Sequence, residues 1–249
     1  MNVSLYQAAA AMNAQSRWQE LITENLAGGT VPGFRKQNIS FASVAAASPA
    51  AMNGMAPSNF LIPVARTSTS FQQGELRPSG NPTDFAIDGP GFFEVQLPNG
   101  DKGYTRDGEF QLNAKGQLTT KKGYTVLSDS GPIQFDPNNP SPPTVSVTGQ
   151  ITQAGIAKGN LRVVEFSNPN LLTATSDGCL IADQPGATPE PSSKNSTVHQ
   201  GFLEAPNTSP VVEMGSLINA MRIFEANQKV LQTQDDRMGR AIADLSGTA

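Results

Sequence analysis

The sequence predicts an α+β protein in which a helix at each end of the chain flanks a central all-β region. Three observations indicate this. The alanine-rich stretch from Ser4 to Leu26 contains no Gly or Pro, and an apolar heptad pattern runs from Leu217 to Leu245. Between them, turn signals recur at short intervals from Phe92 to Phe166, which is typical of a β-meander.

The predicted N-terminal helix has a weak apolar stripe. Its large apolar members are Leu5, Met12, Ile22 and Leu26, and Gln19 interrupts them. Gly28 and Gly29 then end the helix, because glycine commonly follows the last helical turn. Pro32 and Gly33, followed by Phe34, are expected to redirect the chain, so the stretch ENLAGGTVPGFRK (24–36) is interpreted as a joint.

The same stretch comes close to the spacing of a phosphate-binding loop, since Gly28 and Gly33 are five residues apart. Phe34 stands where such a loop requires lysine, and the stretch follows a helix instead of a strand. The joint is therefore the preferred interpretation.

The predicted C-terminal helix, from Val211 to Leu245, would be about 50 Å long. Its residues alternate spacings of four and three, which is a heptad pattern with two polar members. The pattern consists of Leu217, Met221, Phe224, Gln228, Leu231, Asp235, Met238, Ile242 and Leu245. A pattern of this length, with polar members, favours a contact with several other helices over a private core.

The central region contains four turn signals, Pro98–Asp101, Asp107–Gly108, Asn113–Gly116 and Lys121–Gly123, with short alternating runs between them. VSVTGQITQ predicts a further hairpin around Thr148-Gly149, and LRVVEF a further strand. Phe92, Phe93, Tyr104, Phe110 and Tyr124 are expected in the β core. The segments ASVAAASPAAMNGMAPS (42–58) and DQPGATPEPSSKNST (183–197) are predicted to be linkers.

Composition excludes several classes of function. The net charge of −4 argues against nucleic acid, which requires clustered Lys and Arg. Cys179 and His199 are the chain's single cysteine and single histidine, so no disulfide and no cysteine-based metal site is expected. His199 is expected to be exposed and Cys179 to be a small apolar residue beside a turn. The N-terminus does not predict a Sec signal peptide.

The acidic residues Glu75, Asp84, Asp88, Asp107 and Glu109 could supply a pair of catalytic carboxylates. Each lies within two residues of Gly, Asn or Pro, where turn chemistry is the better interpretation. We therefore predict no catalytic, cofactor-binding or metal site, and no small-molecule substrate.

Four motifs together resemble the flagellar basal-body rod and hook family of bacterial axial proteins. ENLAGGTVPGFRK is similar to the family's N-terminal helix end, and GELRPSGNPTDFAIDGPGFFEV to its next conserved segment. YTRDGEFQLNAKGQLTTKKGYTVL and GFLEAPNTSPVVEMGSLINAMRIFEANQKVLQTQDDRM are similar to its β signature and its closing helix. Within the family, VLSDSGPIQF is more similar to the proximal rod protein, and FEANQKV would also suit the distal one.

The resemblance implies a non-enzymatic structural subunit without cofactors that stacks helically into a periplasmic rod. It implies that the terminal helices pair as a coiled-coil domain and that the flagellar type III apparatus exports the chain without a cleaved signal peptide. Its partners would be other copies, other rod proteins, hook-side axial proteins and the export apparatus. The expected assembly interface comprises Leu5, Met12, Ile22, Leu26, Leu217, Met221, Phe224, Leu231, Met238, Ile242 and Leu245, and the joint comprises Gly28, Gly29, Pro32, Gly33 and Phe34.

The expected domain organisation has four parts. Residues 1–34 form the N-terminal helix of an axial core, 35–75 an extended linker region, 76–200 the central β domain, and 201–249 the C-terminal linker and helix. A distal rod or hook subunit is the alternative within the family. A secreted β protein that binds carbohydrate or cell wall is the alternative from another class.

Overall fold

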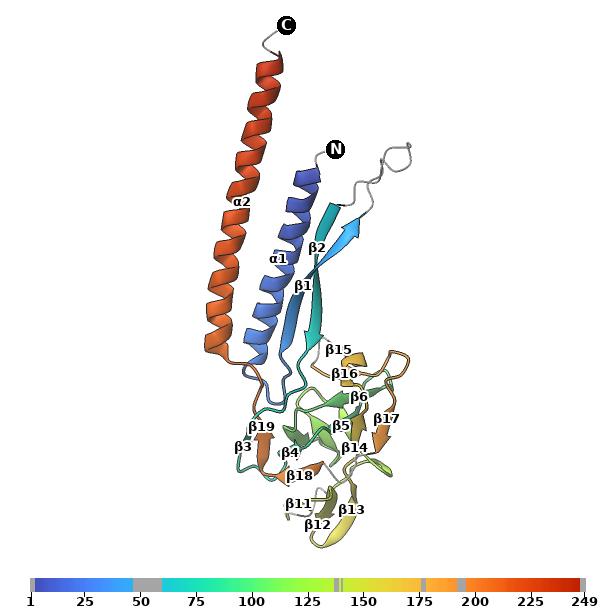
Figure 1. Ribbon diagram of the computed structural model, residues 1–249. Coiled ribbons are helices and arrows are strands. Elements are labelled where there is room, and N and C mark those ends of the chain that lie inside the picture. Colours follow the sequence, from blue (N-terminus) through green and yellow to red (C-terminus); the bar gives the residue numbers. More distant parts are fainter. Residues whose placement is uncertain are drawn as a thin grey trace. The chain divides into compact units, whose positions relative to one another are not determined.

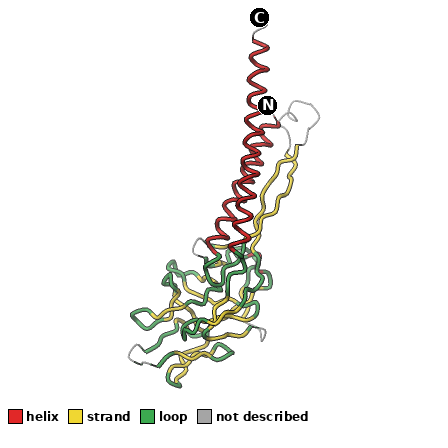
Figure 2. The backbone as a smooth tube through the Cα atoms, turned by 90° about the vertical axis from the view of Figure 1, so that its left-hand side faces the viewer, coloured by secondary structure: helices red, strands yellow, loops and turns green. Residues whose placement is uncertain are grey.

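The fold is described from a computed structural model, which covers residues 3–46, 60–136, 139, 141–175, 178–191 and 196–246. It confirms the α+β class, with two helices and a mostly β body (Figure 1, Figure 2). The chain divides into two units. Met1–Ala27, Gln37–Ser68 and Ser209–Ala249 form the helical unit, and Gly28–Lys36 and Thr69–Thr208 form the β unit.

The helical unit contains α1 (Val3–Gly28) and α2 (Pro210–Ser246), close to the ranges predicted from the sequence. The two helices run in opposite directions (Figure 1). Pro210 occupies the first turn of α2, where its missing N–H would have no helical acceptor. The Glu213 amide then donates the first helical bond, to Ser209 O at 3.0 Å.

The helical unit also contains a two-stranded sheet, β1 (Gln37–Ala46) and β2 (Phe60–Thr69), inside the region predicted as an extended linker. The Asn25 side chain of α1 holds the start of β1, because it accepts from Gln37 N and donates to Gln37 O, both at 2.8 Å. Phe41 meets Trp18 edge to face at 6.1 Å between ring centroids. Residues 47–58 of the predicted 42–58 linker lie outside the described part of the chain.

The β unit is built from short strands and one 3₁₀ turn, Pro169–Leu171. Its strands are β3 (Leu76–Pro78), β4 (Phe85–Asp88), β5 (Phe92–Gln96), β6 (Lys102–Thr105), β7 (Phe110–Leu112), β8 (Leu118–Thr120), β9 (Thr125–Ser128), β10 (Gly131–Pro132), β11 (Pro143–Val145), β12 (Gln150–Gln153), β13 (Ile156–Asn160), β14 (Val163–Phe166), β15 (Thr173–Ala174), β16 (Leu180–Ile181), β17 (Pro189–Pro191), β18 (Thr197–Gln200) and β19 (Phe202–Glu204).

A ten-stranded sheet dominates the β unit, with the order β15-β16-β6-β5-β9-β8-β7. β10 joins it at β9, β14 joins it at β5, and β17 pairs with β14. The remaining strands form a three-stranded sheet, β11-β12-β13, and the pairs β4–β18 and β3–β19. The strand pairs of the β unit are antiparallel wherever the register is described; for example, Phe93 lies opposite Thr105 and Phe110 opposite Thr120.

The predicted turns fall between these strands. Pro98–Asp101 connects β5 to β6, Asn113–Gly116 connects β7 to β8, and Lys121–Gly123 connects β8 to β9. In the Asp107-Gly108 turn, Asp107 Oδ1 accepts a hydrogen bond from Glu109 N at 3.0 Å. This carboxylate therefore has a turn role, as expected. Burial raises the pKa of Asp107 to about 6.

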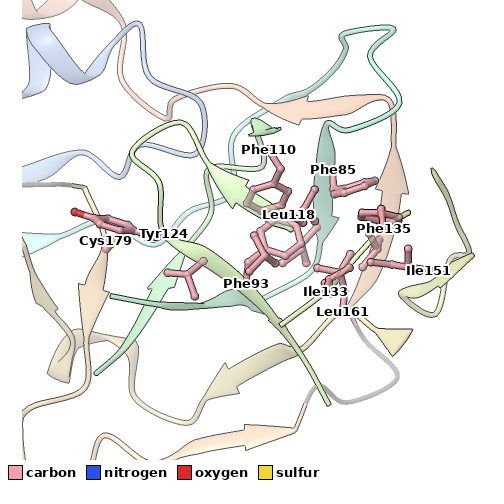
Figure 3. Packing of buried hydrophobic residues seen from close by; sticks show 14 of the residues in the cluster. Phe85, Phe93, Phe110, Leu118, Tyr124, Ile133, Phe135, Ile151, Leu161 and Cys179 are labelled. Carbon is pink, nitrogen blue, oxygen red and sulfur yellow. The ribbon is translucent and has the colours of Figure 1, made fainter. Parts of the chain in front are cut away.

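Apolar side chains gather on both faces of β5, because successive strand residues point to opposite faces. Phe93 and Val95 belong to the main cluster, together with Phe85, Phe110, Leu118, Ile133 and Ile151 (Figure 3). Phe92 belongs to a second cluster, with Tyr104, Val164 and Phe166. The five aromatic residues expected in the core are all buried, and so is Cys179.

Two expectations for the β unit were wrong. His199 lies half-buried in β18, opposite Ala86 of β4, whereas it was expected to be exposed. Part of the predicted 183–197 linker is β17, which pairs with β14 through Val164–Pro191, Glu165–Glu190 and Phe166–Pro189. Proline suits this outer position because it has no N–H to offer a further strand. Residues 192–195 lie outside the described part.

Candidate assembly surface

One face of α2 packs inside the helical unit. Glu213 and Ala220 are buried on this face, and Leu217, Phe224, Leu231 and Met238 are half-buried. On α1, the buried Gln15 side chain donates to the Ala220 carbonyl at 3.0 Å, so the two helices touch at this level. Ala220 has only a methyl side chain, which permits the approach.

The predicted interface residues occupy different environments. On α1, Ile22 is buried, and Met12 and Leu26 are half-buried. On α2, Met221 is 51% exposed, because it lies one residue beyond the buried Ala220. The structure describes the helical backbone but not the side chains at Leu5, Ile242 and Leu245. Whether these residues contact another copy stays a prediction.

A large share of the exposed apolar surface lies on the rest of α2. Among the residues whose side chains are described, fifteen large apolar side chains are exposed, and seven of them belong to α2. These are Val211, Val212, Met214, Ile218, Met221, Ile223 and Val230. A helix that is apolar on several faces is normally buried by neighbours, so this half of α2 has the character of an interface.

The joint predicted from the sequence is a tight turn within the β unit. Val31 N donates to Gly28 O at 3.0 Å, and Phe34 N donates to Val31 O at 3.3 Å. A Cβ atom on Gly28 would overlap the Phe34 ring. Gly33 has φ +68°, and a Cβ there would collide with the backbone of Arg106 and Asp107. Gly33 therefore requires glycine, whereas a side chain at Gly28 would have to displace the Phe34 ring.

A buried group of three charges lies beside this turn. Glu204, at the end of β19, pairs with Arg35 at 2.6 Å and with Arg106 at 3.1 Å, and all three side chains are at most 5% exposed. Arg106 also donates to Ile87 O and Gly89 O and lies 4.9 Å from the Phe92 ring centroid. Burial lowers the Arg106 pKa to about 10, and Glu204 opposes this effect, so Arg106 remains charged at neutral pH.

Asn207 joins three segments of the β unit. Its Oδ1 accepts from Lys36 N at 2.6 Å, and its Nδ2 donates to Ser70 O and Gln72 O, both at 2.9 Å. Sequence analysis did not identify Glu204, Arg106 or Asn207 as important for the joint. In the Glu204 and Asn207 contacts, the two partners are 98 or more residues apart along the chain. No short sequence motif indicates a contact between residues so far apart.

Two further findings concern metal binding and membrane spans. Among the described residues, no three His, Cys, Asp or Glu side chains gather as a metal site requires. Neither of the described helices is long and apolar enough to span a membrane.

Comparison with known proteins identifies the class. Residues 86–153 match the family described as the flagellar hook protein FlgE/F/G D1 domain, and residues 199–244 match the flagellar basal body rod FlgEFG protein C-terminal family. The β unit and α2 therefore both carry family features. The chain belongs to the family of flagellar basal-body rod and hook proteins, and it is a structural rod subunit, not an enzyme.

Individual relatives match almost end to end. The flagellar basal-body rod protein FlgF of Mesorhizobium japonicum is 33% identical, over 98% of this chain and 98% of the relative. FlgF of Caulobacter vibrioides is 31% identical over the same shares. The basal-body rod protein FlgG of Borreliella burgdorferi is 32% identical, over 96% of this chain and 97% of the relative.

The buried charges make a first prediction. Glu204→Gln leaves two buried guanidinium groups without a counter-charge, so we expect the free energy of unfolding to fall by about 3–5 kcal/mol. The matched control is Glu75→Gln, because Glu75 pairs with Arg77 at 3.0 Å but both side chains are about 70% exposed. The control should change stability by about 1 kcal/mol or less in urea unfolding. Equal effects of the two substitutions would contradict the role given to Glu204.

The joint makes a second prediction. Gly33→Ala adds both an unfavourable backbone conformation and a collision with Arg106, so we expect a loss of about 2–5 kcal/mol in unfolding free energy. Gly123→Ala is the control, since Gly123 has φ +87° with open space around its Cβ position. It should lose only the conformational part, about 1–2 kcal/mol. If Gly33→Ala were no less stable than Gly123→Ala, the turn would have rearranged to accommodate the methyl group, and the prediction would be wrong.

Proposed function

We propose that the chain is a proximal rod subunit that assembles helically through its terminal helices in the periplasm. The observation that carries the assembly mode is the exposed apolar surface of α2, from Val211 to Val230. Covering a large apolar side chain contributes about 1.5–3 kcal/mol, so several partly exposed ones together supply a substantial association energy.

The predicted interface residues are proposed to act in this assembly through a coiled-coil arrangement of α1 and α2. Leu217, Phe224, Leu231 and Met238 are only half-buried within the chain, so part of each side chain is available to a neighbour. Ile22, in contrast, is 3% exposed, so it would contribute by packing within its own chain and not by contacting a neighbour.

Assignment to the proximal rod rests on the resemblance of VLSDSGPIQF, which forms β9, β10 and the residues after them. Identities to the FlgF relatives (33% and 31%) and to the FlgG relative (32%) are alike, so they do not decide the subtype. Distal rod and hook subunits are the alternatives. Family membership favours all three over the carbohydrate-binding alternative.

Export by the flagellar type III apparatus, and contacts with other rod and hook-side axial proteins, belong to the same proposal. Their support is the family, together with the low charged fraction of 15% and the single cysteine, which suit an exported and densely packed subunit.

Mass spectrometry of purified hook–basal bodies tests the rod proposal. We expect the chain in the rod fraction, and we expect deletion of its gene to stall assembly. A stall before the distal rod would support the proximal assignment, whereas a complete proximal rod with no distal rod would support the distal alternative. Absence of the chain from intact basal bodies would contradict its role there.

The role of the half-buried side of α2 is tested by Leu231→Asp. The substitution places a carboxylate in a half-buried apolar position, where its charge loses hydration, so we expect rods to be absent and cells to be non-motile. Gln232→Asp is the control, because Gln232 is the exposed neighbour on the same helix. Electron microscopy of basal bodies measures the outcome. Normal rods with Leu231→Asp would rule out this interface, provided that the variant is present in them.

A further inference from the structure

The hairpin formed by β12 and β13 ends in an exposed apolar tip, Ala154–Ile156. Ala154 and Gly155 form the two-residue turn, and Ile156 is 63% exposed, more than any other large apolar side chain described in the β unit. Ala154 has φ +51°, a left-handed conformation that Asn, Asp or Gly adopts with less strain. Backbone strain and an exposed isoleucine at one place indicate that the tip contacts an apolar surface outside this chain.

A shallow hollow of about 270 Å³ lies elsewhere on the β unit, between the Gly28–Phe34 turn and the β3–β19 pair. Its apolar lining residues are Pro32, Pro78, Leu203, Ala205 and Pro206. Proline and alanine lose almost no side-chain freedom when they are covered, so covering this lining costs little entropy. The exposed Val31 and Phe202, each next in sequence to a lining residue, extend the apolar surface beyond the hollow.

The charges beside the hollow do not require a charged partner. Arg77 lines the hollow and pairs with Glu75 at 3.0 Å, with both side chains about 70% exposed. The Ala154–Ile156 tip has no charged or polar side chain. If the tip entered the hollow, the Arg77–Glu75 pair could stay in water at the rim, while Ile156 would lose its contact with water.

Tip and hollow lie apart on the same β unit. The β12–β13 hairpin is at the lower end of the unit in Figure 1, and β3 and β19 lie higher. A contact between the tip of one copy and the hollow of another is therefore heterologous, and it leaves one tip and one hollow free for further copies. Pro206 of the hollow precedes the exposed Val211 of α2 by five residues, at most about 18 Å of extended chain. The hollow is thus close to the proposed α2 interface along the chain.

We infer that the Ala154–Ile156 tip of one copy occupies the hollow beside β3 and β19 of a second copy. This inference rests on the proposed rod assembly, and it gives the β unit a contact with its neighbour in addition to the helices. Ile156 supplies the apolar side chain that enters the hollow, and the tight turn at Ala154-Gly155 holds it in a fixed position.

Disulfide cross-linking in assembled basal bodies tests the inference. Two differently tagged copies of the full chain, one with Ile156→Cys and the other with Ser79→Cys, are expressed together in cells lacking the native gene. Ser79 is exposed and lines the hollow. Air oxidation with a copper–phenanthroline catalyst joins only thiols that come into direct contact. The native Cys179 is retained, since it is 4% exposed, and the unsubstituted chain reports any background from it.

The matched control pairs Val147→Cys with Ser79→Cys. Val147 is 58% exposed and belongs to the turn between β11 and β12, at the other end of β12 from the tip. We expect a dimer carrying both tags from Ile156→Cys with Ser79→Cys, and only background from the control pair.

Three results would overturn the inference. Equal dimer from the two pairs would show that the contact is not specific to the tip. Dimer from Ile156→Cys expressed alone would indicate a contact between two tips. Cross-links only to a different protein would show that the partner is not a second copy.

A second pair, Ala157→Cys with Thr30→Cys, covers the case in which the first substitutions prevent assembly. Ala157 is the exposed neighbour of Ile156, and Thr30 lines the hollow. Absence of this mixed dimer from basal bodies that contain both variants would overturn the inference. If the unsubstituted chain itself were missing from basal bodies, the proposed rod function would fail instead, so the two failures can be told apart.

Discussion

The Glu204 carboxylate holds together the segments of the β unit that surround the turn at Gly28–Phe34. It pairs with Arg35 and Arg106, and its Oε1 also accepts a hydrogen bond from Gly74 N at 2.7 Å. The Glu204 carbonyl accepts from Gly33 N at 2.8 Å. One residue thus ties together segments that lie far apart along the chain, and removal of its charge would leave two cations buried among them.

Buried charges are an expensive way to hold segments together, since their desolvation opposes their attraction. An apolar cluster of equal volume could be as stable, but it would tolerate several arrangements. The bonds to Arg35, Arg106 and Gly74 have direction, and so do the three bonds made by Asn207. Directional bonds favour one geometry of the turn, which would suit the proposed rod, in which copies repeat with the same geometry.

Sequence patterns predicted the elements whose signals are local. Turn residues located β5 to β9 because Asn, Asp and Gly adopt turn conformations whatever surrounds them. The helix predicted from Val211 to Leu245 matches α2 to within one residue at each end. The heptad pattern included Leu217, Phe224 and Leu231, which are half-buried, and Met221, which is 51% exposed, because heptad spacing does not separate the buried side of the helix from the side next to it.

Other features depended on distant partners and could not be predicted. β1 and β2 lie in a region rich in Ala and Ser, without strong alternation, and the contacts of Asn25 and Trp18 with β1 hold them against α1. His199 was misjudged because its polar neighbours gave no sign that β18 would pair with β4. The Glu204 and Asn207 contacts likewise connect residues that no motif links.

The outer strand β17, with its Pro-Glu-Pro sequence, limits how copies of the chain can pair through the edges of their sheets. In the proposed assembly through the helices, identical copies would lie close together, and an open sheet edge would offer them a competing way to join. Two prolines withhold the donors that edge-to-edge growth would need. This edge of the β unit thereby disfavours amyloid-like stacking, so that in the proposed assembly the edge is left out of the contacts between copies.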